Sequence, residues 1–361
     1  MVNILKTIIC ADIGTSSLKA ALIKSDGTIC AFSRVAFDQT APSAPNAGAC
    51  PAAKISMQKS NNLWLCAFQQ AVAELLQKFP QNKEEIEGIC ISGNGPTFAN
   101  RQFCHLWNDF NGTPEQQKKY REMSGFSLFL PRLFYLKENC PALFNKSASD
   151  YFIFSGPEYL IFQLTNCPVT VLPEERFEAA YWNADILQSN GILPDLLPPF
   201  VKPGFCAGTL TANAAAMLNL GKNCKVYCGM PDFCAALVGT ATTSPGMFCD
   251  RAGSSEGLNL CTQAPITGGG IRTLPSVISG LFNAAVLLPD SGHKFGEFKK
   301  NSIYKDLSFN QTVEELLQKP GSTGFKLMEN IALDVKNGIS LLEKHWGKKI
   351  ETMRVTGGQA H

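Results

Sequence analysis

Charged residues and long apolar stretches are both scarce in this sequence. Only 17% of the 361 residues are charged, and 32 basic against 30 acidic side chains leave a formal net charge of +2. So small an excess gives no electrostatic footprint for nucleic acid or for a membrane surface. No apolar run reaches the roughly 20 residues of a membrane-spanning helix, and Lys6 and Asp12 interrupt the region where a signal peptide has its apolar core. We therefore expect a cytoplasmic protein that binds neither nucleic acid nor membrane.

Paired cysteine motifs are also missing, although the chain has 14 cysteines. They are scattered without a Cys-x-x-Cys pair, and several, such as Cys10 and Cys90, fall in apolar, strand-like sequence. We interpret them as small buried side chains in a reducing compartment rather than as a disulfide framework. The densest group is Cys224, Cys228 and Cys234, and the four histidines lie far from it in sequence. Three cysteines without a fourth ligand nearby do not predict a zinc site.

The sequence does contain two short glycine-centred turns that suit a phosphate group. The first runs from Asp12 to Lys19 (Asp-Ile-Gly-Thr-Ser-Ser-Leu-Lys), and the second covers residues 252–257 (Ala-Gly-Ser-Ser-Glu-Gly). Glycine lets the backbone approach a phosphate closely, while hydroxyl groups and successive N–H groups donate to its oxygens. A third turn, residues 356–358 (Thr-Gly-Gly), follows the last strand-like segment. Together the turns favour a nucleotide held between two related halves, although the first taken alone could be an ordinary hairpin with a polar tip.

The sequence around the first turn has the pattern of consecutive β-hairpins. Residues 6–11 and 18–24 are rich in strand-forming side chains, and Asp26-Gly27 is a strong two-residue turn signal before a third strand at 28–32. The apolar spacing then predicts a buried strand at 86–91 and helices at 62–79, 128–139, 158–164 and 233–243.

The second half again alternates strands and helices. A strand at 258–262 follows the second turn, and a capping box is expected at Thr312-x-x-Glu315. Apolar residues at helical spacing predict a long helix that stops at Gly347. A strand at 350–355 then runs into the third glycine turn. This order of strand, helix, strand and glycine turn is the one that a nucleotide site at strand ends requires.

Several motifs resemble, in this order, those of the FGGY carbohydrate kinases of the actin-like ATPase superfold. The segment Asp12–Lys19 resembles the first phosphate motif of the family, and Gly-Ser-Ser at 253–255 stands where the second usually reads Gly-Thr-Ser. The other similarities are Ile-Ser-Gly-Asn-Gly at 91–95, Leu-Trp-Asn-Asp at 106–109, Asp-Tyr at 150–151 with Leu-Thr at 164–165, Gly-Met-Pro-Asp at 229–232 and Thr-Gly-Gly at 356–358. No single motif is specific for the family. Their order and spacing along nearly the whole chain, taken together, are specific.

The resemblance implies a duplicated two-domain α/β fold of ribonuclease H-like type. We place the N-terminal domain at 1–246 and the C-terminal domain at 247–361. The helices at 128–139 and 158–164 would form a cap around the sugar side. Family members continue beyond the last glycine turn with a further helix, strand and helix. We therefore expect the second domain to be incomplete, with weak ATP affinity and little or no turnover.

The resemblance also implies catalytic and nucleotide-binding residues. Asp232 would be the general base of phosphoryl transfer, or else only a cap of the helix that follows it. Asp12 would hold Mg²⁺ through water, or else serve as a turn residue after a strand. The residues expected to contact ATP, besides Asp12, are Gly14, Thr15, Ser16 and Lys19 in the first turn, Gly253, Ser254 and Ser255 in the second, and Gly357, Gly358 and Gln359 on the adenosine side.

The sugar pocket departs most from the family pattern. Xylulokinase-like members usually have Gln-Met-His-Gly where residues 94–97 are Asn-Gly-Pro-Thr, and a Glu-Glu-Arg-Phe stretch at 174–177 apparently replaces the usual "D-x-SNAS". The expected substrate contacts are Asn94, Trp107, Asp109 and Asp232. A carboxylate can accept sugar hydroxyls and an aromatic face can pack on sugar carbons, although Trp107 and Asp109 could equally be structural.

The expected function is an ATP-dependent kinase for a ketopentose such as xylulose, with a small sugar as its partner and a homodimer as one possible assembly. Three alternatives stay open. They are a kinase for another ketose or a polyol (ribulose, fuculose or glycerol-like), a non-catalytic relative that binds sugar or nucleotide, and another actin-like ATPase. Retention of Asp12, Asp232 and both phosphate turns favours catalysis, because a pure binder needs no base.

Overall fold

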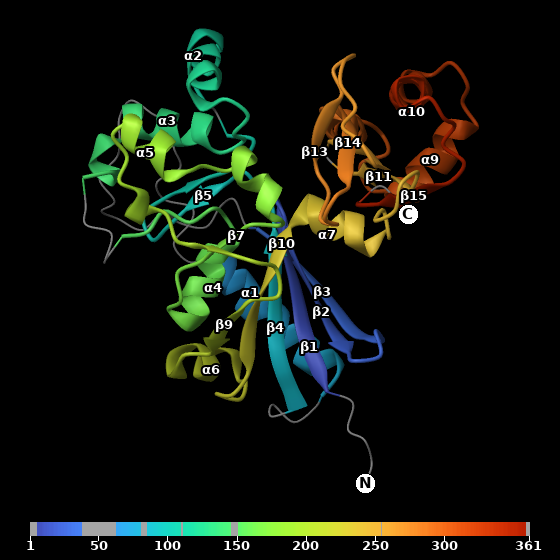
Figure 1. Ribbon diagram of the computed structural model, residues 1–361. Helices are drawn as coiled ribbons and strands as arrows, with labels where there is room; N and C mark the ends of the chain where they lie inside the picture. The colour runs from blue at the N-terminus through green and yellow to red at the C-terminus, as the bar shows by residue number, and fades with distance from the viewer. Residues whose placement is uncertain are drawn as a thin grey trace. The chain divides into compact units, whose positions relative to one another are not determined.

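The computed structural model describes residues 6–37, 63–80, 85–109, 111–145, 151–253 and 255–358. The chain divides into two compact units, Met1–Asp232 and Phe233–His361, each built from a sheet and helices (Figure 1). The expected domain boundary near Gly246 lies inside the second unit, and the functional division into domains 1–246 and 247–361 stays a prediction. Among the helices that the structure describes, none has the length and apolar character needed to cross a membrane.

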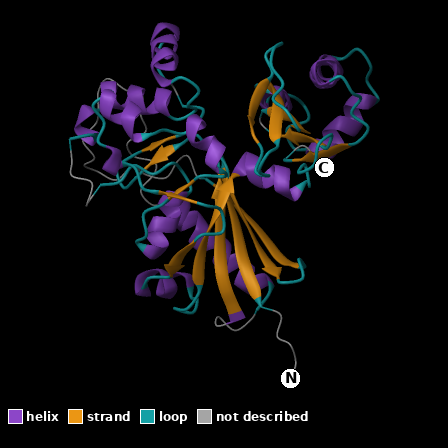
Figure 2. Ribbon diagram, in the orientation of Figure 1, coloured by secondary structure: helices purple, strands orange, loops and turns teal. Residues whose placement is uncertain are grey.

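The first unit is built on a six-stranded sheet, seen as the fan of arrows in Figure 2. Its order is β3-β2-β1-β4-β10-β9, in which β1, β4 and β10 are parallel and the remaining pairs are antiparallel. The strands are β1 (Thr7–Ile13), β2 (Ser17–Lys24), β3 (Ile29–Ala36), β4 (Ile86–Gly93), β9 (Cys206–Thr209) and β10 (Lys225–Pro231). The predicted strands at 6–11, 18–24, 28–32 and 86–91 are confirmed.

Local sequence explains the hairpins at the start of this sheet. Ile9 and Ile13 on β1 and Leu22 on β2 are completely buried, because alternate residues of a strand face the same side. Gly27 adopts a positive φ of 88° in the turn between β2 and β3, and the Thr28 N–H donates to Asp26 Oδ1 at 2.8 Å. The register of all three strands therefore follows from apolar alternation and from the turn.

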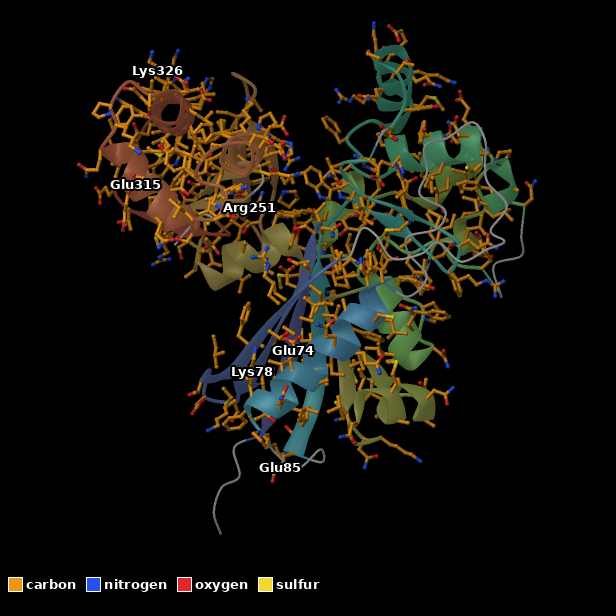
Figure 3. The ribbon with its side chains drawn as sticks, turned by 180° about the vertical axis from the view of Figure 1, so that it is seen from behind. Glu74, Lys78, Glu85, Arg251, Glu315 and Lys326 are labelled. Atoms are coloured by element: carbon orange, nitrogen blue, oxygen red, sulfur yellow. The ribbon has the colours of Figure 1, made fainter. Side chains whose placement is uncertain are left out.

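Helix α1 (Leu63–Lys78) covers β2 and β3, as its periodicity predicted. Its apolar stripe includes Phe68 and Leu75, both fully buried, and each such side chain contributes about 1.5–3 kcal/mol through burial. Two polar side chains of the helix, Glu74 and Lys78, are labelled in Figure 3. Both bond to β3: Ser33 Oγ donates to Glu74 Oε2 at 2.7 Å, and Lys78 Nζ donates to the Phe32 carbonyl at 2.8 Å.

One helix assigned to the cap belongs to the core instead. Helix α4 (Glu158–Thr165) contacts β9 and β10, and its Leu160, Ile161 and Leu164 are fully buried in the main core beside α6 (Ala212–Leu218). The prediction of a cap helix at 158–164 was wrong because an apolar stripe shows that a helix is covered, not what covers it. The expected helix at 128–139 is α3 (Leu130–Asn139), which packs against α2 (Pro114–Ser124).

The segment between β4 and β9 also holds short elements around an aromatic cluster. Phe129 is its centre, with ring centroids 4.5 Å from Tyr181, 5.4 Å from Trp182 and 5.7 Å from Phe98. These elements are β5 (Phe98–Ala99), β6 (Cys104–His105), β7 (Thr170–Val171), α5 (Ala184–Ser189) and β8 (Phe200–Val201).

The second unit repeats the strand pairing of the first. Its sheet has the order β13-β14-β12-β11-β15, with β11 antiparallel to β12, β12 antiparallel to β14, and β11 parallel to β15. The strands β1, β2, β3 and β4 are paired in the same way. The elements are β11 (Phe248–Ala252), β12 (Glu256–Thr262), β13 (Arg272–Pro275), β14 (Phe282–Leu288), α8 (Ser291–Lys300), α9 (Phe309–Leu317), α10 (Thr323–Trp346) and β15 (Met353–Thr356). The long helix ends at Gly347, whose φ is 78°, as predicted.

One local prediction in this half was wrong, and one helix was predicted correctly except that it ends earlier. The capping box of α9 is formed by Ser308 and Gln311, whose side chains each bond the other's backbone N–H, while Thr312 is buried inside the helix and donates to the Ser308 carbonyl. The helix expected at 233–243 is α7 (Asp232–Gly239). It stops early because Ala241 takes a left-handed φ of 50°, which a continuing helix excludes.

Candidate active site

Three of the predicted motifs leave the same edge of the first sheet. Ile13 at the end of β1 is paired with Gly93 at the end of β4, and Gly93 is paired with Pro231 at the end of β10 (Figure 1). The first phosphate turn, Asn94 and Asp232 follow these three positions directly. Ligands of open α/β sheets bind outside the carboxyl ends of parallel strands. The fold therefore gathers the phosphate turn, the sugar-side segment and the expected base at one edge.

The first phosphate turn is closed by a hydrogen bond from the Gly14 N–H to the Ser17 carbonyl at 3.0 Å. Ser16 is exposed, and Gly14 and Thr15 are half-buried. Asp12, on β1, forms an ion pair of 3.3 Å with Lys19, its partner on β2. The other carboxylate oxygen of Asp12, Oδ1, is buried and accepts no hydrogen bond from the part of the chain that the structure describes. Mg²⁺ prefers oxygen ligands and usually keeps several of its water molecules, so a carboxylate oxygen in this position could bind the ion through water.

Asp232 is half-buried at the first residue of α7. The strand that leads to it lies very close to β4, and the Met230 N–H donates to Ser92 Oγ at 3.1 Å. A Cβ atom at Gly229 would lie 2.2 Å from that hydroxyl oxygen and 2.5 Å from the Ile91 carbonyl oxygen. Only glycine permits this approach, so the spacing of β4 and β10 determines where Asp232 emerges.

The sugar-side residues bond to the phosphate turn and its strand. The Trp107 indole N–H donates to Thr15 Oγ1 at 2.8 Å, and the buried Asn94 donates through Nδ2 to the Ile13 carbonyl at 3.0 Å. Asp109 accepts the Leu106 N–H on Oδ2 at 2.7 Å. The structure thus places Asn94 and Trp107 beside the phosphate turn, and Asp109 is bonded to Leu106, the residue before Trp107. Each is engaged within the protein, and their contacts with a sugar stay predictions.

Two residues of this neighbourhood carried no sequence signal. Arg132 on α3 donates to the Leu106 and Trp107 carbonyls. His105 is fully buried with its ring stacked on Tyr135 at 5.7 Å. Burial, with the charge of Arg132 adding to it, lowers the pKa of His105 to about 3, so its imidazole is neutral at physiological pH. These contacts join residues far apart in the chain, and periodicity and short motifs do not reveal such pairs.

The second unit arranges its glycine turns in a similar way. Gly253 follows β11, and Gly357 follows β15, the parallel neighbour of β11. A Cβ atom at Gly357 would lie 2.3 Å from the Ala252 carbonyl oxygen, and its φ is 109°. Ser255 is half-buried just before β12, and Gly358 is exposed. Ser254 and Gln359 lie outside the described residues, as does Asp150.

A family model of the N-terminal domain of the FGGY family of carbohydrate kinases matches residues 7–239. The chain belongs to the FGGY family of carbohydrate kinases. The predicted family is confirmed, and the match includes the first phosphate turn, the sugar-side segment and Asp232.

Relatives and solved structures agree with this assignment. The FGGY chain is 28% identical to the xylulose kinase of Bacillus subtilis (strain 168) over 282 residues, which is 70% of this chain and 52% of the relative. It therefore spans about half the length of that curated relative. The ligand-bound xylulose kinase from Lactobacillus acidophilus matches with a TM-score of 0.75 at 16% identity, over 98% of this chain and 81% of the other. Glycerol kinase from Plasmodium falciparum with ADP matches with a TM-score of 0.73 at 14% identity, over 98% and 82%. These likenesses confirm the actin-like ATPase fold.

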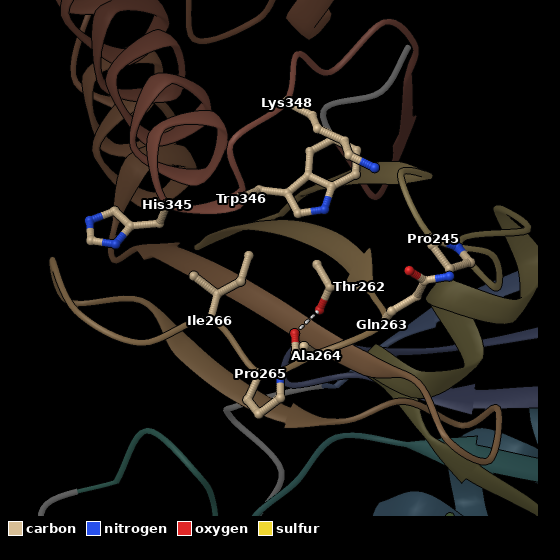
Figure 4. Close-up of a pocket in the computed structure, with 9 residues that line it drawn as sticks. All are labelled: Pro245, Thr262, Gln263, Ala264, Pro265, Ile266, His345, Trp346 and Lys348. Atoms are coloured by element: carbon tan, nitrogen blue, oxygen red, sulfur yellow. Dashed lines mark hydrogen bonds between the residues drawn. The ribbon is translucent and has the colours of Figure 1, made fainter.

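One cavity of the FGGY chain lies away from the glycine turns. It has a volume of about 410 Å³ and is lined by Pro245, Thr262, Gln263, Ala264, Pro265, Ile266, His345, Trp346 and Lys348 (Figure 4). Thr262 is the last residue of β12, whereas the turn at Gly253 precedes the first residue of that strand. The cavity and the turn are therefore at opposite ends of β12, and we assign the cavity no part in the nucleotide site. Within the described residues, no three His, Cys, Asp or Glu side chains are grouped to hold a metal ion.

Two buried carboxyl groups flank the second glycine turn. Asp250 and Glu256 are each only 5% exposed, and among the described residues Asp250 Oδ1 and Glu256 Oε2 have no hydrogen-bond partner. Burial, followed by the charge of Glu256, raises the pKa of Asp250 to about 7, and burial likewise raises the pKa of Glu256. Folding therefore shifts both groups toward the protonated form relative to the unfolded chain.

We expect this to make the second unit less stable as the pH rises from about 4 to about 7. In that window the unfolded chain has released the Asp250 proton, whose ordinary pKa is about 3.9, while the folded chain retains it, so stability is fully present at low pH. Asp250→Asn should flatten the pH dependence and stabilise the unit at pH 8 by up to about 4 kcal/mol, since the pKa is raised by about three units and one unit corresponds to about 1.4 kcal/mol. Glu256, whose pKa burial also raises, should retain a slope of the same sign.

Urea unfolding at pH 5 and pH 8 tests this, followed by the fluorescence of Trp346, the one tryptophan in residues 233–361, in a background where the other three tryptophans are replaced by phenylalanine. The exposed Asp306 is the control position, and Asp306→Asn should leave the pH dependence unchanged. An Asp250→Asn variant with the wild-type pH dependence would contradict the prediction.

Proposed function

We propose that this chain acts in an ATP-dependent carbohydrate kinase that transfers the γ-phosphate of ATP to a hydroxyl group of a ketopentose such as xylulose. The observation that carries the proposal is the convergence of the phosphate turn, the sugar-side segment and Asp232 at the ends of β1, β4 and β10. The family match supports phosphoryl transfer to a carbohydrate.

The proposed chemistry divides the work among these groups. Asp232 would accept the proton of the attacking sugar hydroxyl as general base. Gly14, Thr15 and Ser16 would donate backbone and hydroxyl protons to the β- and γ-phosphates, with Lys19 as a further charge. In the second unit Gly253, Ser254 and Ser255 would also contact phosphate, and Gly357, Gly358 and Gln359 would line the adenosine side.

Asp12 would hold Mg²⁺ through water. Its unpartnered Oδ1 fits that role, because Mg²⁺ in kinase sites is bound by few carboxylates and keeps several waters. When bound, the ion neutralises charge on the phosphate oxygens. Lys19 pairs with the other oxygen, and no donor in the described ranges of the chain occupies Oδ1.

Xylulose is preferred because the curated relative described above is a xylulose kinase. The structural neighbours include a gluconate kinase from Lactobacillus acidophilus and the Plasmodium glycerol kinase. Another ketose, a polyol or a sugar acid is therefore the second candidate substrate class.

The test is a coupled ADP-release screen with xylulose, ribulose, fuculose, gluconate and glycerol, with calorimetric titration of each sugar in parallel. We expect the highest kcat/KM for a pentulose. Binding of a sugar without ADP release in any preparation would favour the non-catalytic alternative. Neither binding nor release with any of these compounds would reject the proposed function.

A further inference from the structure

Two hydrogen-bonded paths join Trp107 to the phosphate turn. The indole N–H reaches Thr15 directly, with 2.8 Å between Nε1 and Oγ1. The backbone N–H of Trp107 donates to Thr97 Oγ1 at 3.2 Å, and this hydroxyl donates to Asn94 Oδ1 at 2.6 Å. The Asn94 N–H and side-chain amide both donate to the Ile13 carbonyl, next to Gly14. Side chain and backbone of Trp107 are therefore tied to the same turn.

Arg132 holds this tryptophan from the other side. Its Nη1 donates to the Leu106 carbonyl at 3.1 Å and its Nη2 to the Trp107 carbonyl. The Leu106 N–H in turn donates to Asp109. The planar guanidinium of arginine presents several donors in a fixed geometry, so one side chain can fix two consecutive carbonyls, which a lysine amine cannot do with the same rigidity.

The charges around Arg132 support a fixed position. Asp109 favours the charged guanidinium, and burial is the opposing effect that lowers the Arg132 pKa to about 10, so the group is charged at neutral pH. His105, which lies on the same side, is neutral and adds no competing charge. Thus Arg132 keeps its donors for the backbone of residues 106 and 107.

We propose that Arg132 is a positioning residue that orients Trp107 so that its indole N–H occupies a lone pair of the Thr15 hydroxyl. A hydroxyl that accepts one proton retains its own proton as a donor. With Trp107 in place, the Thr15 O–H is directed to a phosphate oxygen, and the sugar side and the phosphate turn move as one body. This inference rests on the proposed function, which makes the two sides parts of one reaction.

The first test needs no substrate. The protein is labelled with 5-fluorotryptophan, and the fluorine signal of Trp107, one of four tryptophans, is assigned from its loss in Trp107→Phe. We expect Arg132→Met and Thr15→Val to shift this signal, and the double variant to shift it no further than Thr15→Val alone. Lys137→Met is the control, because Lys137 lies on the same helix and donates to the distant Asn190 carbonyl. Arg132→Lys serves the same comparison if the methionine variant does not fold.

The second test is kinetic. Arg132→Met should lower kcat/KM by about 10- to 100-fold through misplacement of the pocket and should raise the KM for the sugar, with partial recovery in Arg132→Lys. A purely structural role would reduce the active fraction and leave KM unchanged. An unshifted Trp107 signal in Arg132→Met overturns the inference, whether or not the chain is a kinase. A shifted signal with no activity in the sugar screen rejects the proposed function and leaves the positioning of Trp107 standing.

Discussion

Asp232→Asn is expected to lower turnover by roughly 10²- to 10⁴-fold, the range for loss of a positioned general base. The substitution is nearly isosteric and removes only the ability to take a proton from the sugar hydroxyl. Asparagine is also accepted at helix starts, so α7 should still begin at this residue. Sugar affinity and thermal stability should therefore stay close to those of the wild-type protein. ADP release and calorimetric titration of the sugar, in the most active preparation from the substrate screen, measure the two effects separately.

The matched control is Asp185→Asn, an exposed acid in the first turn of α5. It changes the same chemical group at a comparable helix position, away from the sheet edge, and should not alter turnover. Near-normal turnover of Asp232→Asn would show that Asp232 is only a helix cap. A loss of sugar affinity equal to the loss of turnover would assign it to binding instead of proton transfer.

Local signals predicted most of the sheet-forming sequence. The first hairpins follow from apolar alternation and Asp26-Gly27, and the end of α10 follows from Gly347, because each depends on neighbouring residues. The same reasoning failed where two local solutions compete. Ser308 and Gln311 form the capping box expected from Thr312 and Glu315, since glutamine fills the role as well as glutamate.

The candidate site was only partly predictable, for a different reason. Motifs marked the residues that follow β1, β4 and β10, and the parallel register brings those strand ends together. The contacts of Trp107 with Thr15 and with Arg132 link three segments that are separate in the sequence. No periodic pattern encodes such contacts, because they depend on how segments that are distant in the sequence pack against one another.

Gly229→Ala should destabilise the first unit by about 3 kcal/mol, the upper part of the range for overpacking a tight interior. The new methyl group would meet Ser92 Oγ at 2.2 Å and the Ile91 carbonyl oxygen at 2.5 Å, so β4 and β10 must separate. Asp232 follows Gly229 closely, and its displacement should lower turnover beyond the loss explained by unfolding. Urea unfolding and ADP release at a temperature where the variant is folded measure both.

Two further variants make this prediction specific. Adding Ser92→Ala to Gly229→Ala removes the contact with the hydroxyl and leaves the one with the Ile91 carbonyl. Because Ser92→Ala also removes the acceptor of the Met230 N–H, the Gly229→Ala change should cost less stability in the Ser92→Ala background than in the wild-type protein, but should still be destabilising. Gly239→Ala is the control, because no atom lies within 4 Å of a Cβ atom at the end of α7, and alanine is the better helix former. It should be neutral or slightly stabilising. If the free energy of unfolding and the turnover of Gly229→Ala instead equal those of the wild-type protein, the close approach of β4 and β10 is not what positions Asp232. The base must then be held by the start of α7 alone.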